Sequence, residues 1–171
     1  TLYPLLAGNN TFTGTNTMTG RFVIPMDELH YFSISGTQIT ISAQSDGSTN
    51  MVKAAVSSTL NGGAGFDNGG ADNARLRYTG TTTKMFHVAC TISISPASAN
   101  DVFVSGIAKN GTVIPASKVL YQAVTASQSR STALHVMVEL EKNDYLELYV
   151  GNTTDTDDLT ILTESLFAMG M

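Results

Sequence analysis

Alternation of apolar and polar residues is the feature that most constrains the fold of this chain. Residues 134–140 carry Leu or Val at every second position, and the turn EKND follows. Residues 145–150 then alternate again, with Leu and Val opposing Tyr and Glu. A period of two residues places one set of side chains on each face of an extended backbone. Both segments are therefore predicted to be strands joined by a tight turn.

The same strand signals recur along the chain, and no segment makes a convincing helix. Residues 101–109 run into an Asn-Gly pair, the strongest short-range signal of a β-hairpin, and Pro115 in the answering segment indicates a sheet edge or a bulge. The other predicted strands lie at residues 31–43 (one strand or a hairpin), 51–60, 84–95 and 159–170, with a long Gly/Asn/Asp loop at residues 62–73. The spacing in residues 51–60 also fits a helix, but β-branched residues and flanking glycines favour a strand. About eight strands with polar loops predict an antiparallel β-sandwich or jelly roll.

The composition is that of one globular domain with few charges on its surface. Hydrophobic residues make up 42% of the 171 residues and charged residues 13%, so much of the surface must be Ser, Thr, Asn and Gly. The net charge is −5 and the nine Lys and Arg residues are scattered, which argues against nucleic-acid binding. No apolar run is long enough to span a bilayer and no signal-peptide pattern is present, so no membrane insertion is expected. The single cysteine, Cys90, excludes an internal disulfide.

A short repeat stands near the start of the chain. Residues 9–20 read NNTFTG and TNTMTG, two six-residue phrases with one apolar residue each, Phe12 and Met18. One apolar residue in six has nothing to pack against within a single chain, so the phrase makes sense if copies or other chains lie beside it. We therefore predict an N-terminal arm over residues 1–29, whose Phe12 and Met18 contact a particle or a trimer axis, and a head over residues 30–171. The alternative is a Thr-rich arm whose repetition is accidental.

Several motifs follow one another over roughly residues 74–171. They are the strand MFHVACTISI, a strand that ends in KNG, the segment LHVMVELEKNDYLELYV, and Phe167 near the end of the sequence. Their layout resembles the C1q/TNF-like jelly-roll family, although Asn143 stands where the family usually has a turn glycine and only Gly170 remains of its glycine-rich final motif. The resemblance implies an all-β, antiparallel jelly-roll head and a homotrimer whose inner sheets pack around an axis. The repeat at residues 9–20 resembles phrases common in bacteriophage structural proteins, where C1q-like heads often end fibres and capsid projections.

Few residues indicate metal binding or nucleophilic chemistry. His30, His87 and His135 have no Cys, Asp or Glu partner at ligand spacing, and a metal site needs three or four converging donors. They are interpreted as core or interface residues, with one alternative: in a trimer, His87 or His135 of each chain could surround the axis and bind a metal. Cys90 lies among apolar residues without a base, which is typical of a buried small residue and not of a nucleophile.

The carboxylates do not form a catalytic pattern either. Glu139 and Glu141 fall on one face of a strand, whereas a glycosidase needs two opposed carboxylates and aromatic residues that carry the sugar, and the chain has no Trp. The protein is therefore predicted to have no catalytic residues and no cofactor, and not to be an enzyme. The turn at residues 152–158 offers Asp155, Asp157 and Asp158 as oxygen ligands for calcium, but it lacks the Gly and Glu of known calcium loops, and acidic turns are usually only solvated.

Topology predicts where a binding surface would lie. Antiparallel strands place successive loops at alternating ends, so the loops at residues 96–100, 125–131 and 151–158 are expected at the end opposite the C-terminus. Their short polar side chains suit hydrogen bonding to carbohydrate. The candidate residues are Asn100, Gln128, Arg130, Asn152, Asp155 and Asp157.

Together these features favour a structural protein on a bacteriophage virion surface. It would be a homotrimeric capsid decoration or head projection, held to the major capsid protein by its arm. Two hexads are too few for a fibre shaft, and Thr1 suits removal of an initiator Met, so a full-length chain is expected. The first alternative is the knob of a tail fibre, joined to the fibre shaft, which binds a host cell-surface glycan. The second is a secreted C1q-like signalling module, against which stand the missing signal peptide and the missing collagen repeat.

Overall fold

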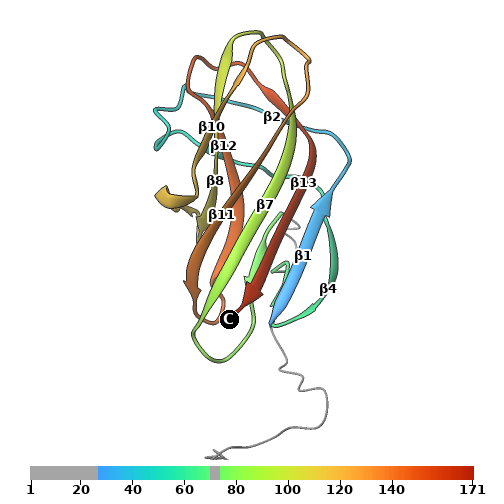
Figure 1. Cartoon of the computed structure of the whole chain (residues 1–171), viewed down its shortest axis with the longest axis vertical. Coiled ribbons are helices and arrows are strands. Elements are labelled where there is room, and N and C mark those ends of the chain that lie inside the picture. Colours follow the sequence, from blue (N-terminus) through green and yellow to red (C-terminus); the bar gives the residue numbers. More distant parts are fainter. Residues whose placement is uncertain (1–26, 70–73) are drawn as a thin grey trace, which may run out of the picture.

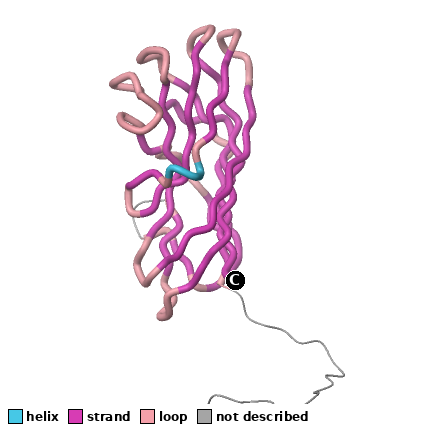
Figure 2. The backbone as a smooth tube through the Cα atoms, turned by 60° about the vertical axis from the view of Figure 1, so that its left-hand side comes forward, coloured by secondary structure: helices cyan, strands magenta, loops and turns pink. Residues whose placement is uncertain are grey.

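Two antiparallel sheets pack face to face, with the hydrophobic core between them (Figure 1). The computed structural model describes residues 27–69 and 74–171, so Phe12 and Met18 lie outside the described residues. Sheet A has the order β11 (Arg130–Leu140), β7 (Lys84–Pro96), β13 (Leu159–Gly170), β1 (Glu28–Ser33) and β4 (Thr59–Ala64), and β2 (Thr37–Ile39) also pairs with β13. Sheet B has the order β10 (Val119–Ala123), β8 (Asp101–Lys109), β12 (Tyr145–Asn152), β6 (Leu76–Tyr78) and β5 (Phe66–Asp67), with β3 (Val52–Lys53) on β12 and β9 (Thr112–Val113) on β8. The turned view in Figure 2 shows the sheets as two layers.

This arrangement confirms the predicted all-β, antiparallel jelly-roll sandwich. Cys90 is buried on β7, as expected. The one helix in the described ranges is a single 3₁₀ turn, η1 (Pro115–Ser117), so Pro115 starts this turn and does not lie on an edge strand or in a bulge. Within the same ranges, no helix is long and apolar enough to cross a membrane.

The two turns with the clearest sequence signals form as expected. Asn110 and Gly111 connect β8 to β9 with φ angles of 52° and 77°, the positive values that a tight hairpin turn requires at both central positions. In the EKND turn, Asn143 has φ of 74° and its amide donates to the carbonyl of Tyr78 at 2.8 Å. The strands on either side of that turn, β11 and β12, belong to different sheets. The turn therefore carries the chain across the sandwich.

Three segments differ from the sequence prediction. Residues 31–43 form neither one strand nor a hairpin, because Gly36, at φ of 66°, separates β1 from β2 and both pair with β13. Residues 51–60 form only the short β3 and the start of β4, and the predicted loop at residues 62–73 is partly occupied by the end of β4 and by β5. β1 begins at Glu28, and its second residue, Leu29, packs in the core.

A bulge in β13 changes which side chains face the core. The register against β7 shifts between Ile161 and Thr163. Before the shift, the odd-numbered Leu159 and Ile161 are buried, and after it the even-numbered Glu164 and Leu166 are buried. An extra residue in one strand reverses the alternation of its side chains. The bulge is therefore the reason that Glu164 points into the core.

The loops gather at two ends of the sandwich. β13 runs toward the C-terminus at one end, and the loops at residues 97–100, 124–129 and 153–158 lie at the other end, which we call the distal pole (Figure 1). These loops contact one another, because the amide of Ala97 donates to the carbonyl of Asp158 at 3.0 Å and the amide of Ser127 donates to the carbonyl of Pro96 at 2.9 Å.

Candidate functional site

The face of sheet A that points away from the core is a largely uncharged surface, which we call the outer face. Strand register fixes its rows of neighbouring side chains. One row contains His135, Ala89, Phe167 and His30, and the next contains Met137, His87, Met169 and Glu28. Met85 and Met137 on this face are 41% and 44% exposed. The outward positions of β1, β7, β11 and β13 carry two charged residues, Glu28 and Glu139, and no Lys or Arg.

The three histidines all lie on the outer face. The rings of His87 and His135 have centroids 5.8 Å apart, so they are side by side on neighbouring strands. His30 stacks on Phe32 at 5.6 Å, and its Nε2 is 2.7 Å from the hydroxyl of Ser165. Among the described residues, no histidine belongs to a group of three or more side chains placed to share one metal ion.

The outer face is hollowed between β7, β11 and β13. This shallow depression has a volume of about 360 Å³. It is lined by Thr91, Ile92, Ser93, Ser131, Thr132, Ala133 and Thr163. The small side chains at these positions leave the space, and the hydroxyls of Ser93 and Ser131 are bonded to each other at 2.8 Å. The depression is thus a recess in the same uncharged face.

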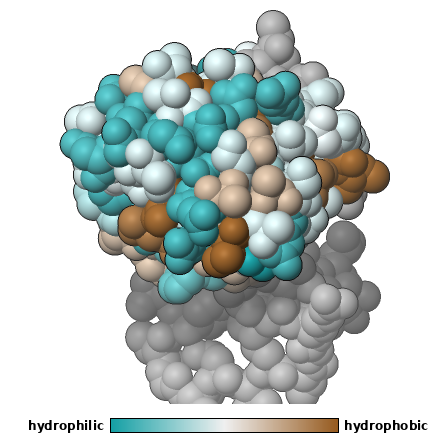
Figure 3. All heavy atoms as spheres, turned by 90° about the horizontal axis from the view of Figure 1, so that it is seen from above, coloured by the Kyte–Doolittle hydropathy of each residue, from teal (hydrophilic) through white to brown (hydrophobic). Residues whose placement is uncertain are grey.

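The distal pole is polar, and Figure 3, which looks down on it, shows mainly hydrophilic surface with separate apolar spots. Asn100 and Gln128 are exposed there, and Arg130 donates to the Gln128 side chain at 3.0 Å. Asp155 and Asp157 are half-buried. Asn152 has no exposed surface. All the candidates except Asn152 therefore have exposed surface that a ligand can contact. Asn152 instead contacts the loop from inside.

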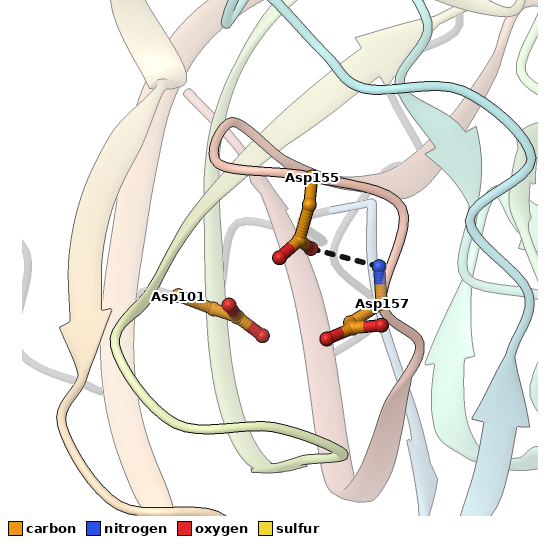
Figure 4. Close-up of side chains that lie close together, drawn as sticks. All are labelled: Asp101, Asp155 and Asp157. Carbon is orange, nitrogen blue, oxygen red and sulfur yellow. Dashed lines mark hydrogen bonds between the residues drawn. The ribbon is translucent and has the colours of Figure 1, made fainter.

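Asp101, Asp155 and Asp157 form a group that we call the aspartate cluster. One carboxylate oxygen of each lies within 4.8 Å of the others. Figure 4 shows the three carboxylates directed toward one another, Asp101 from the start of β8 and the other two from the β12–β13 loop. Burial raises the pKa of Asp101, and the negative charges of Asp155 and Asp157 raise it further.

The amide side chain of Asn152 organises the loop around the cluster. Its Oδ1 accepts from the backbone amides of Thr154 and Asp155 at 2.9 and 3.3 Å, and its Nδ2 donates to Oδ1 of Asp155 at 2.6 Å. The same Asp155 oxygen accepts from the amide of Asp157 at 2.8 Å. These local bonds are the turn chemistry that Asn and Asp favour. They fix the direction of the Asp155 carboxylate and the course of the backbone that carries Asp157.

The structure separates Asp158 from the other predicted calcium ligands. Its carboxylate accepts from the backbone amide of Ile41 and the side chain of Gln38, both at 2.9 Å, and so fastens β2 beside β13. Asp101 takes its place in the cluster. Sequence reasoning missed Asp101 because the only local signal is a carboxylate at the first position of a strand, and its partners lie far away in the sequence.

A second buried polar group lies in the core. The hydroxyl of Tyr31 donates to Oε1 of Glu164, and both residues are almost completely buried. Burial raises the pKa of Glu164 to about 8, and the Tyr31 hydrogen bond and the charge of Lys53 oppose part of that rise. Burial also raises the pKa of Cys90, and the nearby Glu164 raises it further. The thiol is therefore protonated and buried, unlike a nucleophile.

Comparison with known proteins identifies the fold. No protein-family model matches the chain, and no curated protein matches its sequence. Murine APRIL is similar in structure with a TM-score of 0.54 and 10% identity, over 85% of this chain and 99% of APRIL. Eiger, a TNF from S. frugiperda, is similar with a TM-score of 0.50 and 12% identity, over 86% of this chain and 94% of Eiger.

A viral protein is also among the similar structures. The vertex protein P5 of PRD1 has a TM-score of 0.49 and 9% identity, over 85% of this chain and 96% of P5. At 10% and 12% identity, the likeness to APRIL and Eiger concerns the fold alone. The part of the chain that the structure describes has a TNF-like jelly-roll fold.

Proposed function

We propose that this protein is a structural component of a bacteriophage virion surface, a homotrimeric capsid decoration or head projection. The observation that carries the proposal is the outer face of sheet A. Large exposed apolar areas on a protein mark surfaces that contact other proteins. Phe32, Phe167 and Met137 lie on this face, and its charges are confined to Glu28 and Glu139.

A second and third copy of the chain are the partners that this face suits. Its central rows contain small and neutral side chains such as Ala89 and Ser165 beside the aromatic ones, so identical faces can approach without burying unpaired charges. The sequence resemblance to the C1q/TNF-like family favours three copies around an axis. The virion location rests on the repeat at residues 9–20, which lies outside the described residues.

Light scattering coupled to size-exclusion chromatography tests the trimer. We expect three copies of the 18.1 kDa chain per particle at micromolar concentration. The variant Met137→Glu adds a charge to the outer face at a side chain that is 44% exposed, so its head should fold yet remain monomeric. The matched control Leu120→Glu changes a 60% exposed side chain on sheet B and should stay trimeric. A monomeric wild-type protein, or a trimeric Met137→Glu variant, would refute the use of this face.

Labelling of particles tests the virion location. Gold-tagged antibody against the head should decorate the capsid of phage particles from the genome that encodes the chain. Label at fibre tips would instead support the knob of a tail fibre, and particles without label would refute both. Purified head that lacks residues 1–20 should fail to rebind stripped capsids, because the arm is proposed to hold the major capsid protein.

A glycan-binding knob is the second candidate function. It is favoured by the polar distal pole, where Asn100 and Gln128 are exposed. The wild-type head should then bind a set of host glycans on an array, and the paired change of Asn100 and Gln128 to Ala should reduce that binding at least about tenfold. The control Ser58→Ala lies away from the three distal loops and should bind normally. Absence of any bound glycan would reject this function and leave the capsid role untouched.

A further inference from the structure

The aspartate cluster concentrates negative charge, and the described residues place no basic partner beside it. Elsewhere in the described residues, Asp67, Asp144 and Glu147 each form a salt bridge with Arg or Lys at 2.7 or 2.8 Å. No Lys or Arg of the described part of the chain forms a salt bridge with Asp101, Asp155 or Asp157. Three carboxylates this close repel one another unless a proton or a cation lies between them.

Asp101 supplies an independent sign that something binds there. Asp101 is 1% exposed, and its Oδ2 has no hydrogen-bond partner among the residues that the structure describes. A buried carboxylate oxygen without a partner is unfavourable, and most such groups in folded proteins are satisfied. Figure 4 shows this carboxylate directed toward that of Asp157. The unsatisfied oxygen therefore belongs to a group that points into the cluster.

We propose that the aspartate cluster binds one calcium ion through Asp101, Asp155 and Asp157. Carboxylate oxygens are hard ligands, which Ca²⁺ and Mg²⁺ prefer. Two oxygens that bind the same Ca²⁺ at about 2.4 Å lie at most about 4.8 Å apart, and one carboxylate oxygen from each of the three residues lies within that limit of the others. Mg²⁺ binds at about 2.1 Å in a strict octahedron and usually keeps several water ligands beside one or two carboxylates, so three carboxylates favour Ca²⁺. The half-buried Asp155 and Asp157 leave room for water as the remaining ligands.

The ion would join two segments of the distal pole. The β12–β13 loop already contacts the start of β8, since the amide of Thr153 donates to the carbonyl of Val102 at 2.7 Å and the amide of Val102 donates to the hydroxyl of Thr154 at 2.9 Å. Calcium adds a link through side chains at the same junction. The site lies within one chain and uses no residue of the outer face, so it does not depend on the proposed trimer or on the virion role.

Isothermal titration of the EDTA-treated full chain with CaCl₂ tests the site. We expect one ion per chain, and at least about a tenfold loss of affinity in Asp101→Asn and in Asp157→Asn, because each removes a charged ligand. Asp157→Asn keeps the test valid if the buried Asp101→Asn variant folds poorly. The control Glu141→Gln removes an exposed acid at the opposite end of the sandwich and should bind like the wild-type protein.

Three results would overturn the proposal. The first is absence of calcium binding up to about 10 mM, beyond the weak end of the range for extracellular calcium modules. The second is unchanged binding in both Asp variants, which would place the ion elsewhere. The third is saturable binding of MgCl₂ without binding of CaCl₂, which would assign the cluster to the smaller ion.

Discussion

Glu164 and Asp101 are both 1% exposed, and each has one carboxylate oxygen without a hydrogen-bond partner in the described ranges, but their surroundings differ. Glu164 lies in the core, where Tyr31 donates to its other oxygen. Asp101 lies at the distal pole beside Asp155 and Asp157. The free-energy cost of a buried carboxylate oxygen without a partner is therefore reduced in a different way at each residue. Burial keeps a proton on Glu164, whereas the three adjacent carboxylates form the site that we propose for a cation.

The largest expected effect concerns the proton on Glu164. Its folded pKa of about 8 lies above its ordinary value of 4.5, so the folded state holds this proton more tightly than the unfolded state. The free energy of unfolding should therefore be highest below about pH 4.5 for this group, and should fall by about 1.4 kcal/mol per pH unit up to about pH 8. The side chain of Glu164→Gln stays neutral at every pH. Between pH 5 and 8 the free energy of unfolding of this variant should therefore fall by about 3 kcal/mol less than that of the wild-type protein, as measured by urea unfolding.

Parallel pH profiles for Glu164→Gln and the wild-type protein would contradict this view. They would mean that Glu164 stays charged in the core, with Lys53 as the group that compensates it. Asp67 and Asp144 have lowered pKa values and add the opposite slope in acid, which is why the difference between the two proteins is the informative quantity.

The second effect concerns the proposed cation at the distal pole. The difference in stability between Asp101→Asn and the wild-type protein should change sign when calcium is added. Calcium at one hundred times its Kd should stabilise the wild-type protein by about 2.7 kcal/mol, and Asp101→Asn should lose most of that gain. In EDTA, Asp101→Asn should be more stable than the wild-type protein by about 1 kcal/mol, because it removes repulsion from Asp155 and Asp157. Thermal unfolding of both proteins in EDTA and in CaCl₂ measures all four values.

A destabilised Asp101→Asn variant in EDTA would count against this comparison. It would mean that the charge of Asp101 is already stabilised without a cation. Glu164→Gln serves as the control here, since its stability relative to the wild-type protein should be the same in EDTA and in CaCl₂.

The third effect isolates the partner of Glu164. Tyr31→Phe removes the hydroxyl that donates to Glu164 in the core, and an unmade buried hydrogen bond costs about 1–2 kcal/mol. The same hydrogen bond lowers the pKa of Glu164, so its loss should move the pH-dependent fall in stability to higher pH. Tyr121→Phe is the control, because that hydroxyl bonds to Ser105 at 2.9 Å and its removal should leave the pH range unchanged. An unshifted pH range in Tyr31→Phe would show that the hydrogen bond does not act on Glu164.

The sequence predicted the architecture well because the strand pattern is local. The alternation in residues 134–140 and 145–150 and the Asn110-Gly111 turn each depend on neighbouring residues, and all formed as expected. Segments that depend on distant partners were predicted less well. One case is β4, which pairs with β1 through glycine-rich backbone. No alternation of side chains in this segment predicts a strand.

The two buried carboxylates were missed for the same kind of reason. Simple alternation in β13 carries Leu159, Ile161 and Phe167 on one face and leaves Glu164 on the other, and only the bulge turns Glu164 inward. Asp101 and the β12–β13 loop meet through tertiary packing, so the spacing of these residues in the sequence does not indicate the cluster. Of the three predicted calcium ligands, Asp155 and Asp157 belong to the cluster. The third, Asp158, accepts from the backbone amide of Ile41 instead.

The smallest effect tests whether the loop itself is built for the ion. The hydroxyl of Thr154 accepts from the amide of Val102, next to Asp101, so Thr154→Val should cost about 0.5–1.5 kcal/mol and weaken calcium binding a few-fold by loosening the junction. Thr156→Val is the matched control, since Thr156 is exposed in the same loop and forms no hydrogen bond in the described structure. Affinity from titration and stability from urea unfolding should fall together in Thr154→Val alone. A fall in stability without a fall in calcium affinity would mean that the carboxylates bind the ion without this hydrogen bond in the loop. The position of the buried Asp101 would then be enough to form the site.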